Sequence, residues 1–530
     1  MLLSAFVMTY LFGEFELDPA QRELRVNEEV RPLQPQVFDL LLYLIEQHAR
    51  VVPKGELLEQ LWPDAIVTES SLQRAVSLAR SALGDRGPEL IQTFPRQGYR
   101  FVGDIVAPEK PSARVALRPR YAQSGDVHIA FTTMGEGDVD IVVVNGWILP
   151  MRAMFQHPKT RGFFDALSRL GRVITFDKRG TGLSDRVKEL PPHEQRMDDL
   201  RVVLDACDVE QALLIGFSEG GALAMLYAAT HPERVRGLLL CGAFARMTRT
   251  SDFACGWAHE EMERLKGYIR GGWGRGASLR PIAPEGLRQD QEFLDWVAFA
   301  EQEGTSPGGA LDLLQMNMEI DLRATLPAIR VPTAVLQVAD DKMIHPGNGA
   351  YLAKHIPGAW YVEVEGSDHV FFFERQDQLL ATVKRLLEHE PAEVEEDRFL
   401  STVLVGSGRA DEPAWLEEVT RFGGVALPDK QQAYFDGPIR AIRCGVVLAK
   451  RLHESFGVHA GAVVRLRSSV RGQAFDVAEA IAGQAPAGEV WVSRVLVDLV
   501  PGSDLRFAPT GGSVTEKSWE IPLFSLRRED

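Results

Sequence analysis

A serine flanked by glycines is the residue of this chain best suited to covalent chemistry. Ser218 stands in Gly216-Phe217-Ser218-Glu219-Gly220, which fits the pattern G-x-S-x-G. The apolar run ALLI precedes it and the helix-forming run GALAMLYAAT follows it, so we expect the serine on a tight strand-to-helix turn. Such a turn leaves no room for side chains, and the N-terminus of the following helix favours a developing negative charge. Ser218 is therefore predicted to be a nucleophile.

An acid and a base follow downstream, each at the end of a strand-like run. Asp340 and Asp341 end the run TAVLQVA, and His369 follows WYVEVE. In such a set the histidine takes the proton of the serine, and the carboxylate orients the imidazole and stabilises its protonated form. From residue 121 onwards, apolar runs that close on Gly, Asp or Ser alternate with helical segments. This alternation predicts a doubly wound α/β sheet with its polar groups at one edge.

Residues 121–388 resemble the α/β-hydrolases in the segments FDKRGTGLSD and GFSEGGALAMLYAATHPERV and in the order Ser, Asp, His. The resemblance implies a catalytic triad of Ser218, Asp341 and His369. Asp341 is preferred because ADDKMIHP aligns best with the Gly-Asp-Arg of the family before a proline, and Asp340 stays the alternative acid.

The same resemblance implies an oxyanion site and a lid. The backbone N–H groups of Glu219 and Trp147 are the expected oxyanion donors, although Asn145-Gly146 stands where many hydrolases have His-Gly. An insertion at about 243–329 is expected to form a helical lid. Its large apolar residues suggest an apolar ligand, or equally a lid that buries its own core: Phe253, Trp257, Trp273, Phe293, Trp296, Met316 and Met318.

The first segment reads as short strands over residues 9–33, three helices and a hairpin. The third helix, SSLQRAVSLARSALG, follows an expected N-cap at Thr68 and ends at Gly84. Its polar face carries Gln73, Arg74, Ser77 and Arg80. Residues 70–100 hold five Arg and two acidic residues, in a chain whose net charge is −16. This local positive charge favours contact with a polyanion.

Nearly all of residues 10–104 resemble the OmpR/PhoB-type winged helix-turn-helix of transcriptional regulators. The matching pieces are QVFDLLLYLIEQHARVVPKGELLEQLW, SSLQRAVSLARSALGD and TFPRQGYRFVG. The resemblance implies binding of double-stranded DNA, with the third helix in the major groove and the hairpin as the wing. The implied DNA-binding residues are Ser71, Gln73, Arg74, Ser77, Arg80, Arg96 and Arg100. No receiver sequence for aspartate phosphorylation accompanies them.

Residues from about 397 to 528 resemble the class III adenylate/guanylate cyclase domain in DRFLSTVLV, YFDGPIRAIRCGVVL, FGVHAGAVV and GQAFDVAEA. Cyclases need two metal-binding aspartates and a later Asn and Arg. Here the first aspartate is deleted, because TVL runs directly into VGSG, and Asp429 lies near the second position. Asp476 and Ala480 occupy the places of Asn and Arg. We therefore expect no cyclase activity, and dimerisation or domain docking as the remaining role.

Length and composition set the frame for these three segments. A chain of 530 residues with 45% hydrophobic and 25% charged residues is too long for one domain and ordinary for a globular protein. Expected linkers at 107–120 and 389–397 leave domains at 1–106, 121–388 and 397–530. The start is Met1 or Met8. Four cysteines without paired spacing disfavour a disulfide framework or thiolate metal site, and no apolar run is long enough to span a membrane.

The predicted fold class is thus a multidomain α/β chain. It consists of a winged helix-turn-helix, an α/β-hydrolase doubly wound sheet with a helical lid, and an α+β cyclase-like sandwich. We expect a cytoplasmic one-component transcriptional regulator, dimeric and without metal or cofactor. Its hydrolase domain would sense or hydrolyse a small, largely apolar ester or lactone. The alternative is a working serine esterase with secondary DNA binding.

Overall fold

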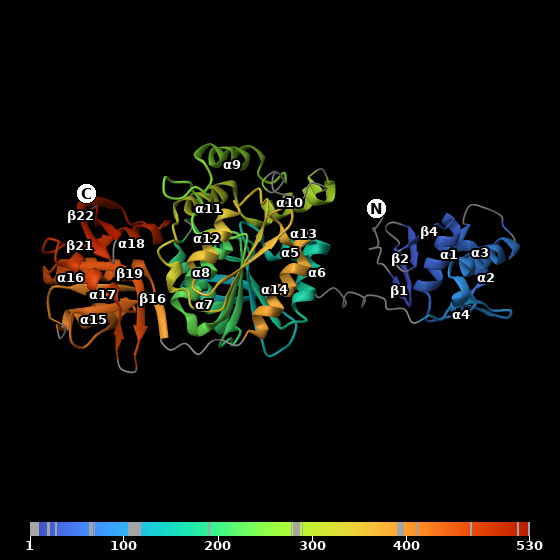
Figure 1. Ribbon diagram of the computed structural model, residues 1–530, viewed down its shortest axis with the longest axis horizontal. Coiled ribbons are helices and arrows are strands. Elements are labelled where there is room, and N and C mark those ends of the chain that lie inside the picture. Colours follow the sequence, from blue (N-terminus) through green and yellow to red (C-terminus); the bar gives the residue numbers. More distant parts are fainter. Residues whose placement is uncertain are drawn as a thin grey trace. The chain divides into compact units, whose positions relative to one another are not determined.

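The computed structural model describes residues 10–18, 22–26, 29–62, 67, 69–103, 118–188, 191–276, 278, 287–288, 290–389, 397–409, 412–466, 469–516 and 519–527. Two compact units, Met1–Ala116 and Leu117–Asp530, make up the chain (Figure 1). Thr68 lies outside the described residues, as do residues 107–117 and 390–396 of the expected linkers.

The first unit begins with a four-stranded antiparallel sheet, followed by a helical core and a small three-stranded sheet. The first sheet runs in the order β1-β2-β3-β4: Tyr10–Phe12, Phe15–Asp18, Glu23–Val26 and Glu29–Arg31. The helices are α1 (Pro35–Glu46), α2 (Lys54–Leu61), α3 (Glu69–Ala82) and α4 (Gly87–Leu90). The second sheet has the order β5-β7-β6: Val52–Pro53, Gly98–Phe101 and Ile91–Phe94.

The apolar spacing read in the first segment produces this helical core. Leu40, Leu41 and Leu44 of α1 are fully buried, and they pack with Leu72 and Val76 of α3. Burial of one stripe leaves the opposite face of α3 exposed to solvent. The predicted order of strands, three helices and hairpin is present, with the short helix α4 added between the third helix and the hairpin.

The second unit is built on an eight-stranded sheet in the order β15-β14-β13-β12-β10-β11-β9-β8. The strands β10 to β15 pair with one another in parallel, and β11 also pairs antiparallel with β9. Their bounds are β8 Arg120–Ser124, β9 Val127–Met134, β10 Asp140–Val144, β11 Arg172–Phe176, β12 Ala212–Phe217, β13 Val235–Cys241, β14 Thr333–Val338 and β15 Trp360–Val364.

Helices cover both faces of this sheet, as the alternating sequence predicted. One face carries α7 (His193–Ala206), α8 (Gly220–Thr230) and α12 (Gly347–His355); the other carries α5 (Met151–Gln156), α6 (Pro158–Leu167) and α14 (Gln376–Glu388). The insertion between β13 and β14 contributes α9 (His259–Gly272), α10 (Gln291–Gly304) and α11 (Pro307–Glu319) (Figure 1). The strands are near-continuous apolar runs because both of their faces are covered.

A second eight-stranded sheet ends the chain, with seven of its strands in the order β17-β18-β16-β19-β21-β23-β22. Its strands are β16 Asp397–Gly406, β17 Val425–Ala426, β18 Gln432–Phe435, β19 Phe456–Arg465, β21 Val490–Ser493, β22 Phe507–Glu516 and β23 Trp519–Leu526, with β20 Val470–Arg471 paired to β19. The helices are α15 Pro413–Arg421, α16 Pro438–Leu452, α17 Gln473–Ala482 and α18 Arg494–Leu499. Alternation along β16 turns Leu404 toward α16 and Val403 toward α17.

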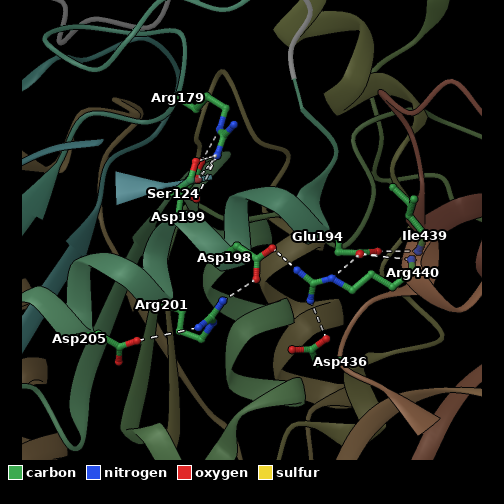
Figure 2. A network of polar contacts seen from close by, with 10 residues as sticks. All are labelled: Ser124, Arg179, Glu194, Asp198, Asp199, Arg201, Asp205, Asp436, Ile439 and Arg440. Atoms are coloured by element: carbon green, nitrogen blue, oxygen red, sulfur yellow. Dashed lines mark hydrogen bonds and ion pairs between the residues drawn. The ribbon is translucent and has the colours of Figure 1, made fainter. Parts of the chain in front are cut away.

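The two sheets of the second unit are joined by a polar contact between α7 and α16 (Figure 2). The carboxylate of Glu194 on α7 accepts the backbone N–H of Ile439 at 2.5 Å and that of Arg440 at 3.3 Å. It therefore caps the free N–H groups at the start of α16. Arg440 reaches back to Asp198 on α7 and to Asp436 at 2.8 Å. The C-terminal sheet is thereby fixed to the same helix that covers the hydrolase-like sheet.

None of the helices in the described residues is long and apolar enough to cross a membrane.

Candidate active site

The turn that carries Ser218 forms because glycines, which have no side chain, lie around it. Ser218 follows β12 with φ of +49°, a left-handed conformation that is strained for a serine. A Cβ on Gly220 would lie 2.3 Å from the carbonyl oxygen of Val144, and one on Gly146 would lie 2.6 Å from that of Phe217. Only glycine lets the end of β10 lie this close to the turn. This close packing holds the strained Ser218 at the carboxyl edge of the sheet.

His369 and Asp341 meet at the same edge. The Nδ1 of His369 lies 2.8 Å from Oδ2 of Asp341, and these side chains are 9% and 0% exposed. The other oxygen of Asp341 accepts the backbone N–H groups of Met343 and Ile344 at 2.7 and 3.0 Å. These bonds turn the Asp341 carboxylate inward, whereas Asp340 is exposed. The geometry thus pairs His369 with Asp341 and leaves its Nε2 for another partner.

A small cavity adjoins Ser218 and His369, with a volume of about 50 Å³. Most of its wall is apolar and comes from Trp147, Leu149, Phe217, Leu265, Met343, Val370, Phe371 and Phe372. Ser218, Ser278 and His369 contribute the polar groups. Among the described residues that line it there is no Asp, Glu, Lys or Arg. A cavity of this kind accepts a small neutral group beside the serine.

The large apolar lid residues named in the sequence analysis are not among the described residues that line this cavity. Trp273 packs edge-on against Trp147 at 6.3 Å, and Trp296 donates its indole N–H to the carbonyl of Ala153 at 2.8 Å. Phe293 is 1% exposed inside a cluster with Trp296. These aromatic residues pack against the body of the hydrolase domain and against one another, outside the described wall of the cavity. The described wall of the cavity instead uses Leu265 of α9 and the Phe371-Phe372 pair beside His369.

The two expected oxyanion residues flank Ser218 from different strands. Trp147 follows β10 and has φ of +44°, and it lines the cavity with Ser218. Glu219 follows Ser218 at the N-terminus of α8, where the helix dipole favours negative charge. The Glu219 side chain points away from solvent and is 4% exposed.

A buried ion cluster beside the Ser218 turn was not predicted from the sequence. The Glu219 carboxylate pairs with Lys178 through Oε2 and with Arg196 through Oε1 at 2.8 Å. Burial raises the pKa of Glu219, but the two neighbouring cations outweigh it, and the net pKa lies below the ordinary value. Burial lowers the pKa of nearby His193 to about 3, so this imidazole is neutral. The only sequence signal was a lysine at the buried end of a strand.

The segment FDKRGTGLSD forms a network of polar contacts at a turn. Asp177 accepts the backbone N–H groups of Met151 and Leu183 at 2.7 and 2.8 Å. Arg179 pairs with Asp199 of α7 and bonds to Ser124. These groups tie the end of β11 to the neighbouring loops.

The expected DNA-binding residues of the first unit fall into two groups. Gln73, Arg74 and Ser77 are exposed on one side of α3, Ser71 is half-buried near its start, and Arg96 is exposed in the hairpin turn. Arg80 and Arg100, in contrast, have bonds within the domain. Arg80 donates to the carbonyl of Ile91 at 2.6 Å and to Thr93, which ties α3 to the wing. Arg100 donates to the carbonyl of His48 at 2.9 Å.

No group of three or more His, Cys, Asp or Glu in the described part of the chain is placed to hold a metal ion. The four cysteines are free thiols.

Comparisons with known proteins agree with the fold of this part of the chain. The family described as the α/β hydrolase fold matches residues 141–376. The AB hydrolase superfamily protein YisY of Bacillus subtilis is 29% identical over 253 residues, 45% of this chain and 88% of that protein. The RutD protein of Azorhizobium caulinodans is 30% identical over 260 residues, 47% of this chain and 91% of that protein. The chain belongs to the α/β-hydrolase family.

This α/β hydrolase also carries a regulatory domain. The family described as transcriptional regulatory protein, C terminal, matches residues 27–101. The transcriptional regulator HilA of Salmonella typhi is 34% identical over 116 residues, 21% of each chain. The chain is therefore a transcriptional regulatory domain fused to an α/β-hydrolase domain, and the regulatory domain implies DNA binding. The predicted winged-helix and hydrolase folds are confirmed.

Proposed function

We propose that this protein is a one-component transcriptional regulator whose hydrolase domain binds and hydrolyses a small, largely apolar ester or lactone. The observation that carries the proposal is the cavity at Ser218, where a nucleophile, an Asp341-supported His369 and an apolar wall converge. DNA binding by the first unit is the output, and occupation of the cavity is the input.

The chemistry follows from the residues at the cavity. Ser218 Oγ attacks the carbonyl carbon while its proton passes to Nε2 of His369, and Asp341 stabilises the imidazolium. The oxyanion forms on the N–H groups of Trp147 and Glu219. Collapse breaks the bond to the alcohol oxygen, which takes the proton from His369 and leaves an acyl-serine. Water then attacks the acyl group with His369 as base, which releases the acid and restores Ser218.

The cavity wall limits the substrate class. A volume of about 50 Å³ accepts only a short chain or a small ring beside the serine. A charged acyl group would lose its hydration without gaining a partner, because the described wall holds no residue of opposite charge. A neutral short-chain ester or a small lactone fits these limits.

A ligand in the cavity can change DNA binding only if its affinity differs between two arrangements of the chain. A ligand shifts the chain between two arrangements to the extent that it binds one of them more tightly. Hydrolysis would remove the ligand and reset the regulator.

A working serine esterase with secondary DNA binding is the second candidate. The 2.8 Å contact between His369 and Asp341 favours it, because ligand sensing alone does not need an oriented base. A promoter affinity that does not change with any cavity ligand would select this alternative.

For the C-terminal part, residues 397–530, we propose a degenerate cyclase-like sandwich that mediates homodimerisation. The four helices and eight-stranded sheet described above support an α+β arrangement. Asp429 is exposed in the loop between β17 and β18, and Asp476 is exposed on α17. One remaining metal carboxylate does not suffice for cyclase chemistry.

Ser218→Ala tests the hydrolytic half of the proposal. We expect it to abolish hydrolysis of a short-chain nitrophenyl ester, because the nucleophile is lost, while DNA binding in the other unit stays intact. Ser168→Ala is the control, since this serine caps the end of α6 far along the chain from the turn. Equal esterase rates in the wild type and Ser218→Ala would remove hydrolysis from the proposal. Titration of promoter DNA with and without the ester tests sensing.

A further inference from the structure

Lys178 connects the two backbone segments that carry the expected oxyanion donors. Its Nζ donates to the carbonyl oxygens of Asn145 and Trp147, at 3.1 and 2.8 Å. These carbonyls belong to the peptide groups on either side of the Gly146–Trp147 peptide. Its third bond goes to the carboxylate of Glu219. An ammonium has three N–H donors, so this lysine has its full set of partners in one arrangement.

The Trp147 backbone needs such support. Its φ of +44° lies in the left-handed region, which costs a residue with a Cβ on the order of 1 kcal/mol or more. A conformation of this kind persists only when the surroundings hold it in place. Because Lys178 binds the carbonyls before and after the Gly146–Trp147 peptide, it fixes the direction in which the N–H of Trp147 points.

The second donor is held by the same ammonium. The backbone N–H of Glu219 is the other expected oxyanion donor, and the side chain of this residue binds Lys178. The side chains of Lys178, Glu219 and Arg196 are 6%, 4% and 2% exposed, so water does not compete for these bonds. One buried group thus joins the turn after β10 to the turn after β12.

We propose that Lys178 is a positioning residue that sets the geometry of the oxyanion site between Trp147 and Glu219. This inference rests on the proposed hydrolase function. Lys178 should affect the transition state, because the substrate carbonyl oxygen needs the N–H groups of Trp147 and Glu219 only after it becomes negative. Substrate binding in the apolar cavity does not depend on it.

Arg196 provides a matched control. It pairs with the same carboxylate as Lys178, carries the same charge and is similarly buried, but within the described residues its side chain bonds to Glu219 and not to Asn145 or Trp147. Lys178→Met and Arg196→Met therefore remove equivalent charges, and each leaves Glu219 with one cation. Only Lys178→Met releases the Trp147 backbone.

The test compares kcat and KM of these variants in the full chain with a short-chain nitrophenyl ester. We expect Lys178→Met to lower kcat by about 100-fold with KM changed less than threefold, which is the scale of losing one oxyanion donor. Arg196→Met should keep kcat within about fivefold of the wild type. Affinity for a trifluoromethyl ketone, which forms a tetrahedral oxyanion on Ser218, should fall in parallel with kcat.

The outcomes separate this inference from the proposed function. An inactive wild type, also unlabelled by a fluorophosphonate, would overturn both. An active wild type with equal kcat losses in Lys178→Met and Arg196→Met would overturn the role of Lys178 alone. If thermal denaturation shows that Lys178→Met does not fold, Lys178→Gln replaces it, because its neutral, shorter side chain has two N–H donors and cannot satisfy the three acceptors that Lys178 joins. A kcat for Lys178→Gln equal to that of Arg196→Met would then refute the inference.

Discussion

Replacement of Arg440 by alanine is predicted to loosen the C-terminal sheet from the hydrolase domain. Arg440 on α16 contacts Asp198 and lies 3.5 Å from the Glu194 carboxylate, both on α7 (Figure 2). The Arg440 side chain is 31% exposed and that of Glu194 is 8% exposed. Arg443, on the same helix, pairs with Asp504 at 2.8 Å, but these side chains are 51% and 66% exposed. Arg443→Ala is thus a matched control.

The expected magnitude follows from burial. Breaking a fully buried ion pair costs about 3–5 kcal/mol, because the remaining charge stays buried without a partner. Arg440 is partly exposed, and Asp198 retains Arg201 at 3.2 Å, so we expect about 2 kcal/mol. The exposed pair of Arg443 should contribute about 0.5 kcal/mol or less.

Hydrogen exchange measures this difference locally. The amides of Ile439 and Arg440 donate to Glu194, so their exchange reports on the contact itself. A loss of 2 kcal/mol corresponds to about 30-fold lower protection of the first turn of α16. Arg443→Ala should change it by less than threefold. Equal protection in the two variants would refute the reasoning that burial of the Glu194 contact sets its strength.

Two further predictions concern pH and DNA. Burial raises the pKa of Glu194 from 4.5 to about 7, so the docked state holds a proton that the separated state releases. The protection of α16 against hydrogen exchange, corrected for intrinsic exchange, should therefore fall as the pH rises from about 5 to 7 and level off above. Glu194→Gln should remove most of this pH dependence. Asp498, whose pKa burial raises to about 6, contributes a remaining decrease in the same direction. For DNA, Arg74→Ala with Arg96→Ala should reduce the slope of log K against log salt by about two in an anisotropy titration, at about 0.9 per phosphate contact. Arg25→Ala, on the N-terminal sheet, is the control, and an unchanged slope in the double variant would contradict phosphate contacts at α3 and the wing.

Local patterns in the sequence were sufficient for the fold of the regulatory and hydrolase parts. The turn at Ser218 depends on glycines within a few residues of it, and the apolar stripe of α3 depends on helical spacing. Such features are encoded by neighbouring residues, so they can be read without knowledge of the rest of the chain. The same holds for the buried parallel strands, whose continuous apolar runs reflect helices on both faces.

Contacts between distant segments were decided only by the tertiary structure. Asp340 and Asp341 are adjacent in sequence, and only the turn through Met343 and Ile344 shows which carboxylate meets His369. The lid aromatics were identified as large and apolar, but whether they line a cavity or a core depends on the elements packed beside them.

The charged residues were the least predictable from sequence. Arg80 belongs to the polar face of α3, yet it bonds to the wing strand eleven positions further on at Ile91. Lys178 and Glu219 are 41 positions apart and meet only because β11 and β12 both flank β10 in the sheet. The sequence alone determined which elements form and where a nucleophile stands. Which charged side chains are buried together depends on the order of the strands. Water can replace the partner of an exposed charge, but a buried charge needs a specific partner that the fold places beside it.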